Sequence, residues 1–375
     1  MNTDLLLHYT NILLIFTSVF FAFFLLHVKS SNQVGNIFLS IFLIIRTIDI
    51  LPSTFSFLEL TPFVDVLRMD FGAFFQAPLL FLFLLSIIYS DFKLSSKHLL
   101  LLIPFILSTL ILLPRFYLAN ESEQLLFYND YTHTLEGKLS YTLAHLQNLM
   151  YIVITFVLLA KYKKIFLENY SKSTETNYKW LFQMNIICLL LFIFALIKNI
   201  YRFGSHFGLI SILRLSTSII MLGFTCWLIL KALNAPKLFR GISSNLQLAS
   251  SLRINNINSE SHLLDAKKKE LQKFMLENEP YLNSDLTIKS LANQMKTEER
   301  ELSVLINTAL NVNFYEFINL YRINKAKVLL KDEKYSKHTI LEILYQVGYN
   351  SKSSFNTAFK KATGITPSDY REKFQ

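Results

Sequence analysis

Apolar residues are distributed unevenly along this 375-residue chain. Before about Leu233 they form seven long runs with few charges, whereas later they recur in short groups three and four positions apart. A helix needs about 20 residues to cross the roughly 30 Å hydrocarbon layer of a bilayer. The long runs therefore predict seven membrane-spanning helices, near residues 5–27, 34–51, 71–89, 98–118, 141–160, 180–200 and 210–231.

The composition fits a membrane protein better than a soluble enzyme. Hydrophobic residues make up 52% of the chain, including 34 Phe. The two cysteines, Cys188 and Cys226, lie inside apolar runs, which favours neither a disulfide framework nor a Cys-based metal site. The eight histidines show no metal-ligand spacing, and no glycine-rich phosphate loop occurs. We therefore expect no enzyme activity, no cofactor and no bound metal.

Lysine and arginine in the short loops predict the orientation of the spans. With the N-terminus outside, the inner loops hold eight of these residues and the outer loops four. An odd number of spans then leaves the C-terminal part in the cytoplasm. The first run has no basic residues before it and more spans follow it, so it is expected to be a span and not a cleaved signal peptide. The sequence thus predicts a multi-pass protein of the cytoplasmic (inner) membrane.

Polar residues interrupt the outer halves of several spans. Ionisable groups in hydrocarbon are costly, so they usually face a bundle interior or water. We take as a hypothesis an outward-opening pocket of net positive charge that suits an anionic small molecule or a peptide carboxylate. The alternative is that these side chains reach outer headgroups or pair with acidic residues to hold the bundle together. The pocket residues would be Arg46, Asp49, Gln76, His145, Asn148, Lys198, Arg202 and Arg214.

Two segments outside the spans leave alternatives open. The outer loop 119–140 is acidic and aromatic, and is either a lid, a partner-binding loop or, as we favour, a solvated connector. After residue 233, Pro236 and Gly241 break the helix, and residues 243–261 are rich in Ser and Asn, as in a flexible linker. Residues 262–279 then read as an amphipathic helix, either a homodimeric coiled coil or, slightly favoured, a helix packed on the following domain.

The last stretch of the chain predicts two short helices joined by a turn. Thr339 and Glu342 can form a capping box, and the helix that follows stops at Gly348. Asn350 or Ser351 can cap a second helix, which has Phe355 and Phe359 on its inner face and ends at Gly364. Thr366 and Pro367 then open a last helix. This order of elements is typical of a helix-turn-helix, which places its second helix in the DNA major groove.

The residues of this pattern resemble the second helix-turn-helix of AraC-type transcriptional regulators. Those that carry the resemblance are Glu342, Ile343, Gly348, Tyr349, Ser351, Ser354, Phe355, Phe359, Lys360, Lys361, Gly364, Thr366, Pro367, Tyr370 and Arg371. Leu344 departs from the pattern, because the family usually has alanine there. The resemblance covers residues 281–371, about a quarter of the chain, and does not extend to the membrane part.

An earlier stretch resembles the first helix-turn-helix and connecting helix of the same family. It includes Leu291, Ala292, Leu302, Ser303, Ile306, Asn307, Asn313, Phe314, Phe317, Ile318, Asn319, Tyr321, Arg322 and Ala326. Asn311 replaces the usual glycine, and asparagine tolerates the same left-handed turn. Arg322 is expected to form a buried or interfacial ion pair.

The resemblance implies two helix-turn-helix units joined by a helix at residues 314–330, with recognition helices about 34 Å apart along the DNA. Promoter DNA and RNA polymerase are the implied partners. The DNA-contacting residues would be Arg300, Ser303, Val304, Asn307, Lys352, Ser353, Asn356, Thr357, Lys360 and Lys361. Glu298, Glu299 and Glu301 flank Arg300 and would repel phosphates, so we expect the second unit to supply most of the affinity.

The sequence therefore predicts an all-α protein with three parts. Residues 1–233 form a seven-helix transmembrane sensor bundle, 234–280 a cytoplasmic linker with an amphipathic helix, and 281–375 an AraC-type DNA-binding domain. The interpretation is a membrane-embedded one-component transcriptional regulator, activated by dimerisation or by release of the DNA-binding domain. The alternative is a membrane enzyme or transporter with a regulatory or protein-interaction helix-turn-helix domain.

Overall fold

The computed structural model describes residues 3–28, 32–55, 57–89, 91–171, 175–202, 207–234 and 261–374. Over these residues the chain is helical and contains no strand. It divides into two compact units. The first comprises Met1–Leu159 and Asn177–Ser244, and the second comprises Ala160–Thr176 and Asn245–Gln375.

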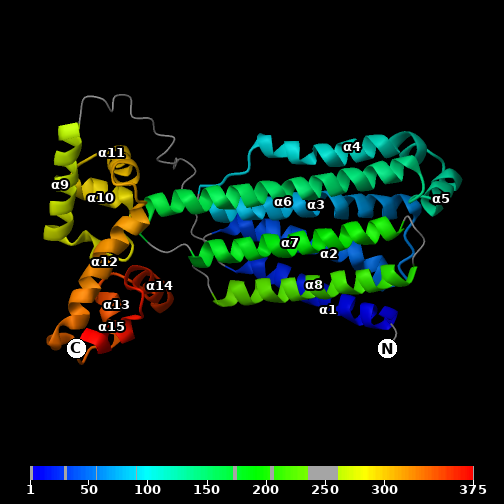
Figure 1. Ribbon diagram of the computed structural model, residues 1–375. Helices are drawn as coiled ribbons and strands as arrows, with labels where there is room; N and C mark the ends of the chain where they lie inside the picture. Colours follow the sequence, from blue (N-terminus) through cyan, green and yellow to red (C-terminus); the bar gives the residue numbers. More distant parts are fainter. Residues whose placement is uncertain are drawn as a thin grey trace. The chain divides into compact units, whose positions relative to one another are not determined.

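In the described part of the first unit, seven apolar helical segments are long enough to cross a membrane (Figure 1). The expected seven-helix architecture is confirmed at this level. The fourth segment consists of a 3₁₀ turn η1 (Ser96–Leu102), α4 (Ile103–Leu112) and a π turn η2 (Leu113–Tyr117). The other six are α1 (Thr3–His27), α2 (Gln33–Thr54), α3 (Pro62–Ile88), α6 (Leu135–Asn169), α7 (Glu175–Arg202) and α8 (Phe207–Asn234).

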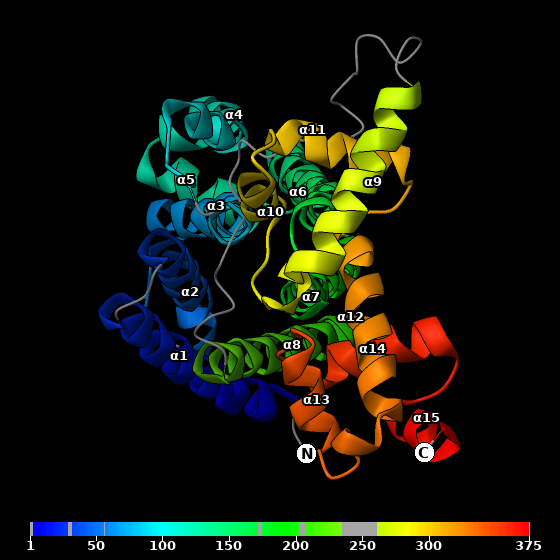
Figure 2. The same ribbon diagram turned by 90° about the vertical axis from the view of Figure 1, so that its left-hand side faces the viewer.

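The helices of this unit bury both apolar and polar side chains between them and turn other large apolar side chains outward. Helix α1 contacts α2 and α8, and α2 also contacts α3 (Figure 2). Between α1 and α2, the Ser40 hydroxyl donates to the carbonyl of Ala22 at 3.2 Å. On the outer face of α1, Phe16, Phe20 and Phe23 are each more than half exposed. Exposed apolar stripes of this kind suit contact with lipid chains.

Two helices extend beyond the apolar runs that predicted them. Helix α3 begins at Pro62 and not near residue 71, because Thr61 accepts a capping bond from the Val64 amide and proline suits the first helical position. Arg68 is one of the four basic residues that the sequence analysis assigned to outer loops, and it therefore lies on a helix instead. Helix α6 continues to Asn169, so its last turns belong to the second unit.

The outer loop 119–140 is not a solvated connector. It contains α5 (Glu121–Asn129), which starts with a capping box formed by Asn120 and Glu123. Phe127 and Tyr131 are buried in a cluster with Val66, Leu112 and Phe116. The loop is thus part of the packed end of the bundle.

In its described residues, the second unit contains two helix-turn-helix cores that share one long helix. That helix, α12 (Phe314–Lys331), places Phe314 and Ile318 in the first core and Ala326 and Leu330 in the second. The first core also contains α9 (Ser261–Asn278), η4 (Pro280–Leu282), α10 (Ile288–Met295), α11 (Glu299–Val304) and η5 (Leu305–Ala309). The second is completed by η6 (Glu333–Tyr335), α13 (Ile340–Gln346), α14 (Lys352–Thr363) and α15 (Pro367–Phe374).

The turns of this unit form where the local signals predicted them. Thr339 and Glu342 make the reciprocal capping bonds at the start of α13, and Ser351 caps α14. Gly348 and Gly364 have φ of +86° and +81°, a left-handed conformation that glycine adopts without a steric penalty. Asn311 takes φ of +53°, as expected for a residue that replaces glycine.

The amphipathic helix before the DNA-binding domain packs on that domain. Leu271 and Met275 of α9 are fully buried in the first helix-turn-helix core. This is the alternative that the sequence slightly favoured for residues 262–279. The preceding part of the linker, residues 235–260, lies outside the described residues.

Candidate nucleic-acid interface and ligand pocket

The second recognition helix, α14, has one buried and one exposed face. Phe355 and Phe359 are fully buried and pack edge-on against Tyr349 and Tyr370, respectively. The opposite face carries the predicted DNA contacts. Lys352, Ser353, Thr357, Lys360 and Lys361 are exposed, and Asn356 is partly exposed. The inner aromatic residues therefore fix α14 so that its polar face is available to a major groove.

The basic residues of α14 differ in their surroundings. Lys361 Nζ forms an ion pair of 3.1 Å with Glu316 of α12. Lys352 lies at the first position of the helix, where long side chains can reach base edges. Lys352 as a base reader and Lys360 and Lys361 as phosphate contacts therefore remain predictions.

The first recognition helix presents fewer of its predicted contacts. Arg300 is exposed and Asn307 is partly exposed. Ser303 and Val304 retain only 6% and 8% of their accessible surface. Asn307 Nδ2 donates to the backbone carbonyl of Ser303 at 2.8 Å, within a stretch where α11 widens into the π turn η5. In this conformation, Ser303 and Val304 are not available to a base edge.

Acidic residues surround this first helix. Glu298 and Glu299 precede Arg300, and Glu301 forms an ion pair with Lys267 of α9. Carboxylates suit the N-terminal end of a helix because of its dipole, but they repel DNA phosphates. The two recognition helices are therefore electrostatically unequal.

Arg322 connects the parts of the second unit. Its guanidinium donates to the carbonyls of Tyr281 at 2.7 Å, Asn283 at 2.8 Å and Ser171 at 3.1 Å. It also lies 5.5 Å from the centre of the Tyr349 ring. Burial lowers the pKa of Arg322 to about 10. The expected burial is confirmed. The described hydrogen-bond partners of Arg322 are carbonyl and hydroxyl oxygens, and the charge of the Asp285 carboxylate also acts on it, so the expected ion pair stays a prediction.

In the first unit, the predicted pocket residues surround a cavity of about 800 Å³. Seven of the eight line it: Arg46, Asp49, Gln76, His145, Asn148, Lys198 and Arg214. The side chain of the eighth, Arg202, lies outside the described residues. At the packed α5 end of the bundle, Tyr128 and Tyr131 also line the cavity.

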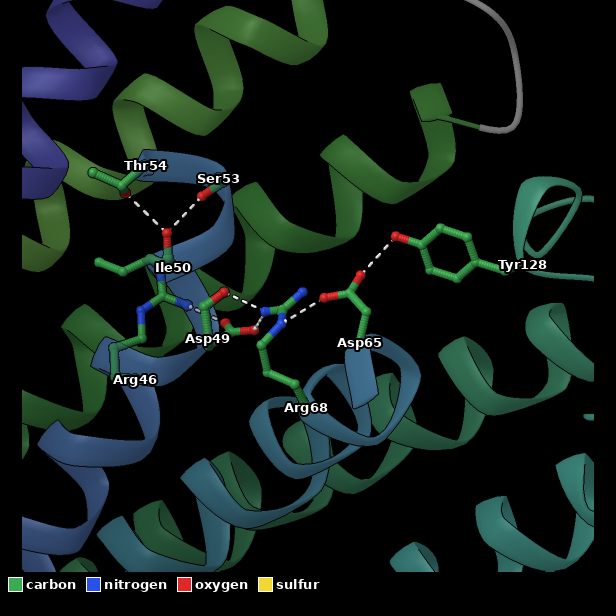
Figure 3. Close-up of polar contacts among 8 residues, drawn as sticks. All are labelled: Arg46, Asp49, Ile50, Ser53, Thr54, Asp65, Arg68 and Tyr128. Atoms are coloured by element: carbon green, nitrogen blue, oxygen red, sulfur yellow. Dashed lines mark hydrogen bonds and ion pairs between the residues drawn. The ribbon is translucent and has the colours of Figure 1, made fainter. Parts of the chain in front are cut away.

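An ion network at one side of this cavity joins three helices (Figure 3). Asp49 of α2 accepts from Arg46 at 3.1 Å and from Arg68 of α3 at 3.0 Å. Arg68 also pairs with Asp65 at 2.8 Å, and Asp65 accepts from the Tyr128 hydroxyl of α5 at 2.7 Å. The network supports the bundle-holding reading for Arg46 and Asp49, while both residues also line the cavity.

Sequence reasoning did not include Arg68, Asp65 and Tyr128 among the pocket residues. The available signal was the spacing of Asp65 and Arg68, since residues three apart share a helix face. His145 also connects two helices of the bundle. Its Nε2 lies 2.8 Å from Asn199 Nδ2, which joins α6 to α7.

The comparisons with known proteins concern the C-terminal quarter of the chain. A family profile described as "Helix-turn-helix domain" matches residues 291–373. An uncharacterized HTH-type transcriptional regulator of Staphylococcus aureus (strain COL) is 36% identical over 93 residues, which are 25% of this chain and 12% of that protein. The HTH-type transcriptional regulator YtdP of Bacillus subtilis (strain 168) is 29% identical over 90 residues, covering 24% of this chain and 11% of that protein.

Two solved structures are also similar in sequence over this region. The C-terminal domain of AraT, a response regulator from Geobacillus stearothermophilus, is 31% identical and covers 31% of this chain and 88% of its own, with a TM-score of 0.25. The C-terminal domain of the response regulator yesN from Fusobacterium nucleatum is 29% identical and covers 28% and 98%, also with a TM-score of 0.25. The C-terminal domain of this chain is an AraC-type helix-turn-helix domain.

Proposed function

We propose that the protein is a membrane-embedded one-component transcriptional regulator. Its cytoplasmic AraC-type domain binds promoter DNA through two helix-turn-helix units, and its seven-helix unit senses a signal at the outer side of the membrane. It is a regulator and not an enzyme. RNA polymerase is the partner through which it acts, and two chains pair on DNA.

The observation that carries the proposal is the exposed polar face of α14 on a chain that also holds seven membrane-length helices. Lys352, Asn356 and Thr357 lie on the accessible side of a helix whose inner side is fixed by Phe355 and Phe359. The seven helices carry outward apolar side chains, and six of them, α1, α2, α3, α6, α7 and α8, contribute to the lining of a cavity that contains charged residues. A DNA-reading part and a ligand-sized cavity thus occur in one polypeptide.

Chromatin immunoprecipitation of the full-length protein, isolated with the membrane fraction, tests this proposal. The wild-type chain is expected to give discrete promoter peaks. The Lys352→Ala/Asn356→Ala variant is expected to lose them, because it removes two groups that can pair with base edges.

The matched control is Ser368→Ala/Lys373→Ala. Like the test variant, the control removes one neutral polar group and one lysine from the surface. Here these are the Ser368 hydroxyl and the Lys373 ammonium, at exposed positions of α15. The control should keep its peaks. Equal peaks for both variants, or a wild-type chain found only in the soluble fraction, would reject the proposal.

A further inference from the structure

Two cavities adjoin inside the seven-helix unit. The larger one, of about 800 Å³, is lined by charged and polar side chains. The smaller one, of about 200 Å³, is lined mainly by apolar side chains, including Phe81, Leu84, Met184 and Phe224. Arg46, Gln76, His145 and Asn148 line both cavities and so mark the boundary between them.

The size of the smaller cavity limits what it can hold. At roughly 30 Å³ per water-sized group, 200 Å³ accommodates about seven such groups. A methylene group is similar in size, so the cavity suits a short acyl chain or a single ring. Burial of each methylene there is favourable, so an apolar tail is the favoured occupant.

The charges around the larger cavity suit an anion. Among its described lining residues, four are cationic, Arg46, Arg68, Lys198 and Arg214, whereas two are carboxylates, Asp49 and Asp65. Within the described structure, Asp49 and Asp65 already accept from Arg46, Arg68 and Tyr128. The described lining residues thus carry a formal excess of two positive charges, which favours an anionic ligand over a cationic one.

Two buried hydrogen-bond donors at the boundary also favour an anionic ligand. Asn199 Nδ2 donates to His145 Nε2, so the ring proton of a neutral His145 lies on Nδ1. In the described part of the chain, neither His145 Nδ1 nor Arg46 Nε has a hydrogen-bond acceptor, although both atoms are buried. Buried donors without acceptors cost free energy, so a ligand that supplies acceptor oxygens at this position is favoured.

We propose that the two cavities together form the binding site for an amphipathic anion, with its carboxylate or phosphate group near Arg46 and His145 and a short apolar tail in the smaller cavity. This inference rests on the sensing role proposed above and names the class of ligand. A purely polar anion leaves the apolar cavity unfilled. A neutral lipid leaves the donors of Arg46 and His145 without a charged acceptor.

Calorimetric titration of the full-length protein in phosphatidylcholine nanodiscs tests the ligand class, with octanoate as the probe and protein-free nanodiscs as the background. Octanoate is expected to bind saturably and at least about tenfold more tightly than octanol, because hydrogen bonds to a charged group contribute about 1.5–3 kcal/mol. It should also bind at least about tenfold more tightly than butyrate, which has four fewer methylenes. Octanol binding equal to that of octanoate would overturn the proposal.

Two variants locate the site. Arg46→Gln removes the boundary charge, and Ala195→Phe fills the junction, because Ala195 lines both cavities. Each should weaken octanoate binding at least about tenfold. The matched controls are Arg115→Gln, whose side chain is 63% exposed and paired with Glu136, and Ile193→Phe on the outer face of α7. The controls should bind like the wild type.

Arg46→Gln removes a partner of Asp49 and can disturb folding, so Ala195→Phe decides the outcome independently. Unchanged binding by a folded Ala195→Phe variant, or no saturable binding by the wild type, would overturn the proposal. Nanodiscs that contain phosphatidylglycerol identify the source of the anion. If phosphatidylglycerol weakens octanoate binding, the natural ligand is assigned as a membrane lipid. If octanoate binding is unchanged, the natural ligand is assigned as a free amphiphile.

These titrations contain no DNA, so the two proposals fail separately. If octanoate does not bind but the promoter peaks are intact, only the proposed ligand class is rejected. If octanoate binds saturably but no promoter peaks occur, only the proposed regulator function is rejected.

Discussion

The guanidinium of Arg322 donates a hydrogen bond of 3.1 Å to the backbone carbonyl of Ser171, 151 positions earlier in the chain. Ser171 follows α6, and its hydroxyl donates in turn to the carbonyl of Leu286 at 2.6 Å. Ser171 is only 1% exposed. The residues at the end of the fifth apolar helix are therefore part of the fold of the C-terminal unit, and Arg322 is the residue that ties them to the connecting helix α12.

Replacement of Arg322 should destabilise this unit strongly. Arg322→Leu leaves the carbonyls of Tyr281, Asn283 and Ser171 without their guanidinium donor, and a buried unsatisfied group costs about 1–3 kcal/mol. We expect the opening free energy of α12 amides in hydrogen exchange to fall by about 3 kcal/mol or more. Arg322→Lys should recover part of this loss, since an ammonium can donate to some of the same oxygens. Wild-type exchange in Arg322→Leu would contradict this role.

Two glycines allow strain and steric overlap to be measured separately. Gly348 and Gly364 both have positive φ, so alanine at either position is expected to cost roughly 1–2 kcal/mol. A Cβ atom at Gly348 would also lie 2.6 Å from the carbonyl oxygen of Tyr281, whereas one at Gly364 would meet nothing within 4 Å. Gly348→Ala should therefore increase proteolysis of the C-terminal unit in urea more than Gly364→Ala does. Equal susceptibility would show that the overlap is relieved at no cost.

Glu279 gives the C-terminal unit a predictable response to acid. Its carboxylate accepts from Lys325 Nζ at 2.7 Å and from the Tyr281 hydroxyl at 2.8 Å, and these bonds hold its pKa below the ordinary 4.5. A carboxyl with a lowered pKa stabilises the fold above its unfolded-state pKa, and this contribution disappears as the pH falls through the folded-state value. Glu279→Gln should thus lower the thermal midpoint above pH 4.5 and have less effect in stronger acid.

Glu277→Gln is the matched control for this pH series. Glu277 lies two residues earlier, is 60% exposed and is 3.8 Å from Lys273. The thermal midpoint of this variant should follow that of the wild type at every pH. A constant offset between Glu279→Gln and the wild type across the same range would exclude Glu279 as a source of the acid response.

The two recognition helices should contribute unequally to DNA affinity. Lys352→Ala removes an exposed cation from α14, whereas Arg300→Ala removes one from a helix flanked by Glu299 and Glu301. Loss of a base contact weakens the binding free energy by about 1–3 kcal/mol. Loss of a phosphate contact lowers the slope of log affinity against log salt concentration by about one. In gel-shift titrations on an immunoprecipitated promoter, Lys352→Ala should weaken binding more. The reverse order would place the main contacts in the first unit.

Features that depend on neighbouring residues could be predicted from the sequence. The capping box of Thr339 and Glu342, the left-handed turns at Asn311 and Gly348, and the buried pair Phe355 and Phe359 each involve positions within a few residues of one another. Local propensity and periodicity determine such features, so a single sequence contains the necessary information.

Features that depend on distant contacts could not be predicted in this way. The charge of Arg68 interrupts the apolar run, so the sequence did not predict the start of α3. In the structure, ion pairs with Asp49 and Asp65 stabilise this charge inside the bundle. The burial of Ser303 and the bonds between Arg322 and Ser171 result from tertiary packing between segments far apart in the chain. Helix α5 had a usable local signal, the capping pair Asn120 and Glu123, but the burial of its Phe127 depends on the distant residues Val66 and Leu112.

The unequal exposure of the two recognition helices makes the length of a nuclease footprint a report on conformation. With Ser303 and Val304 buried and Lys352 and Thr357 exposed, the chain described here offers base-reading side chains mainly from α14. On the function proposed above, such a chain should protect one major-groove segment. A rearrangement that exposes α11 adds a second segment about 34 Å away on the same face of the duplex. On the function proposed above, the number of protected base pairs should therefore report which recognition helices contact the DNA, before any transcript is measured.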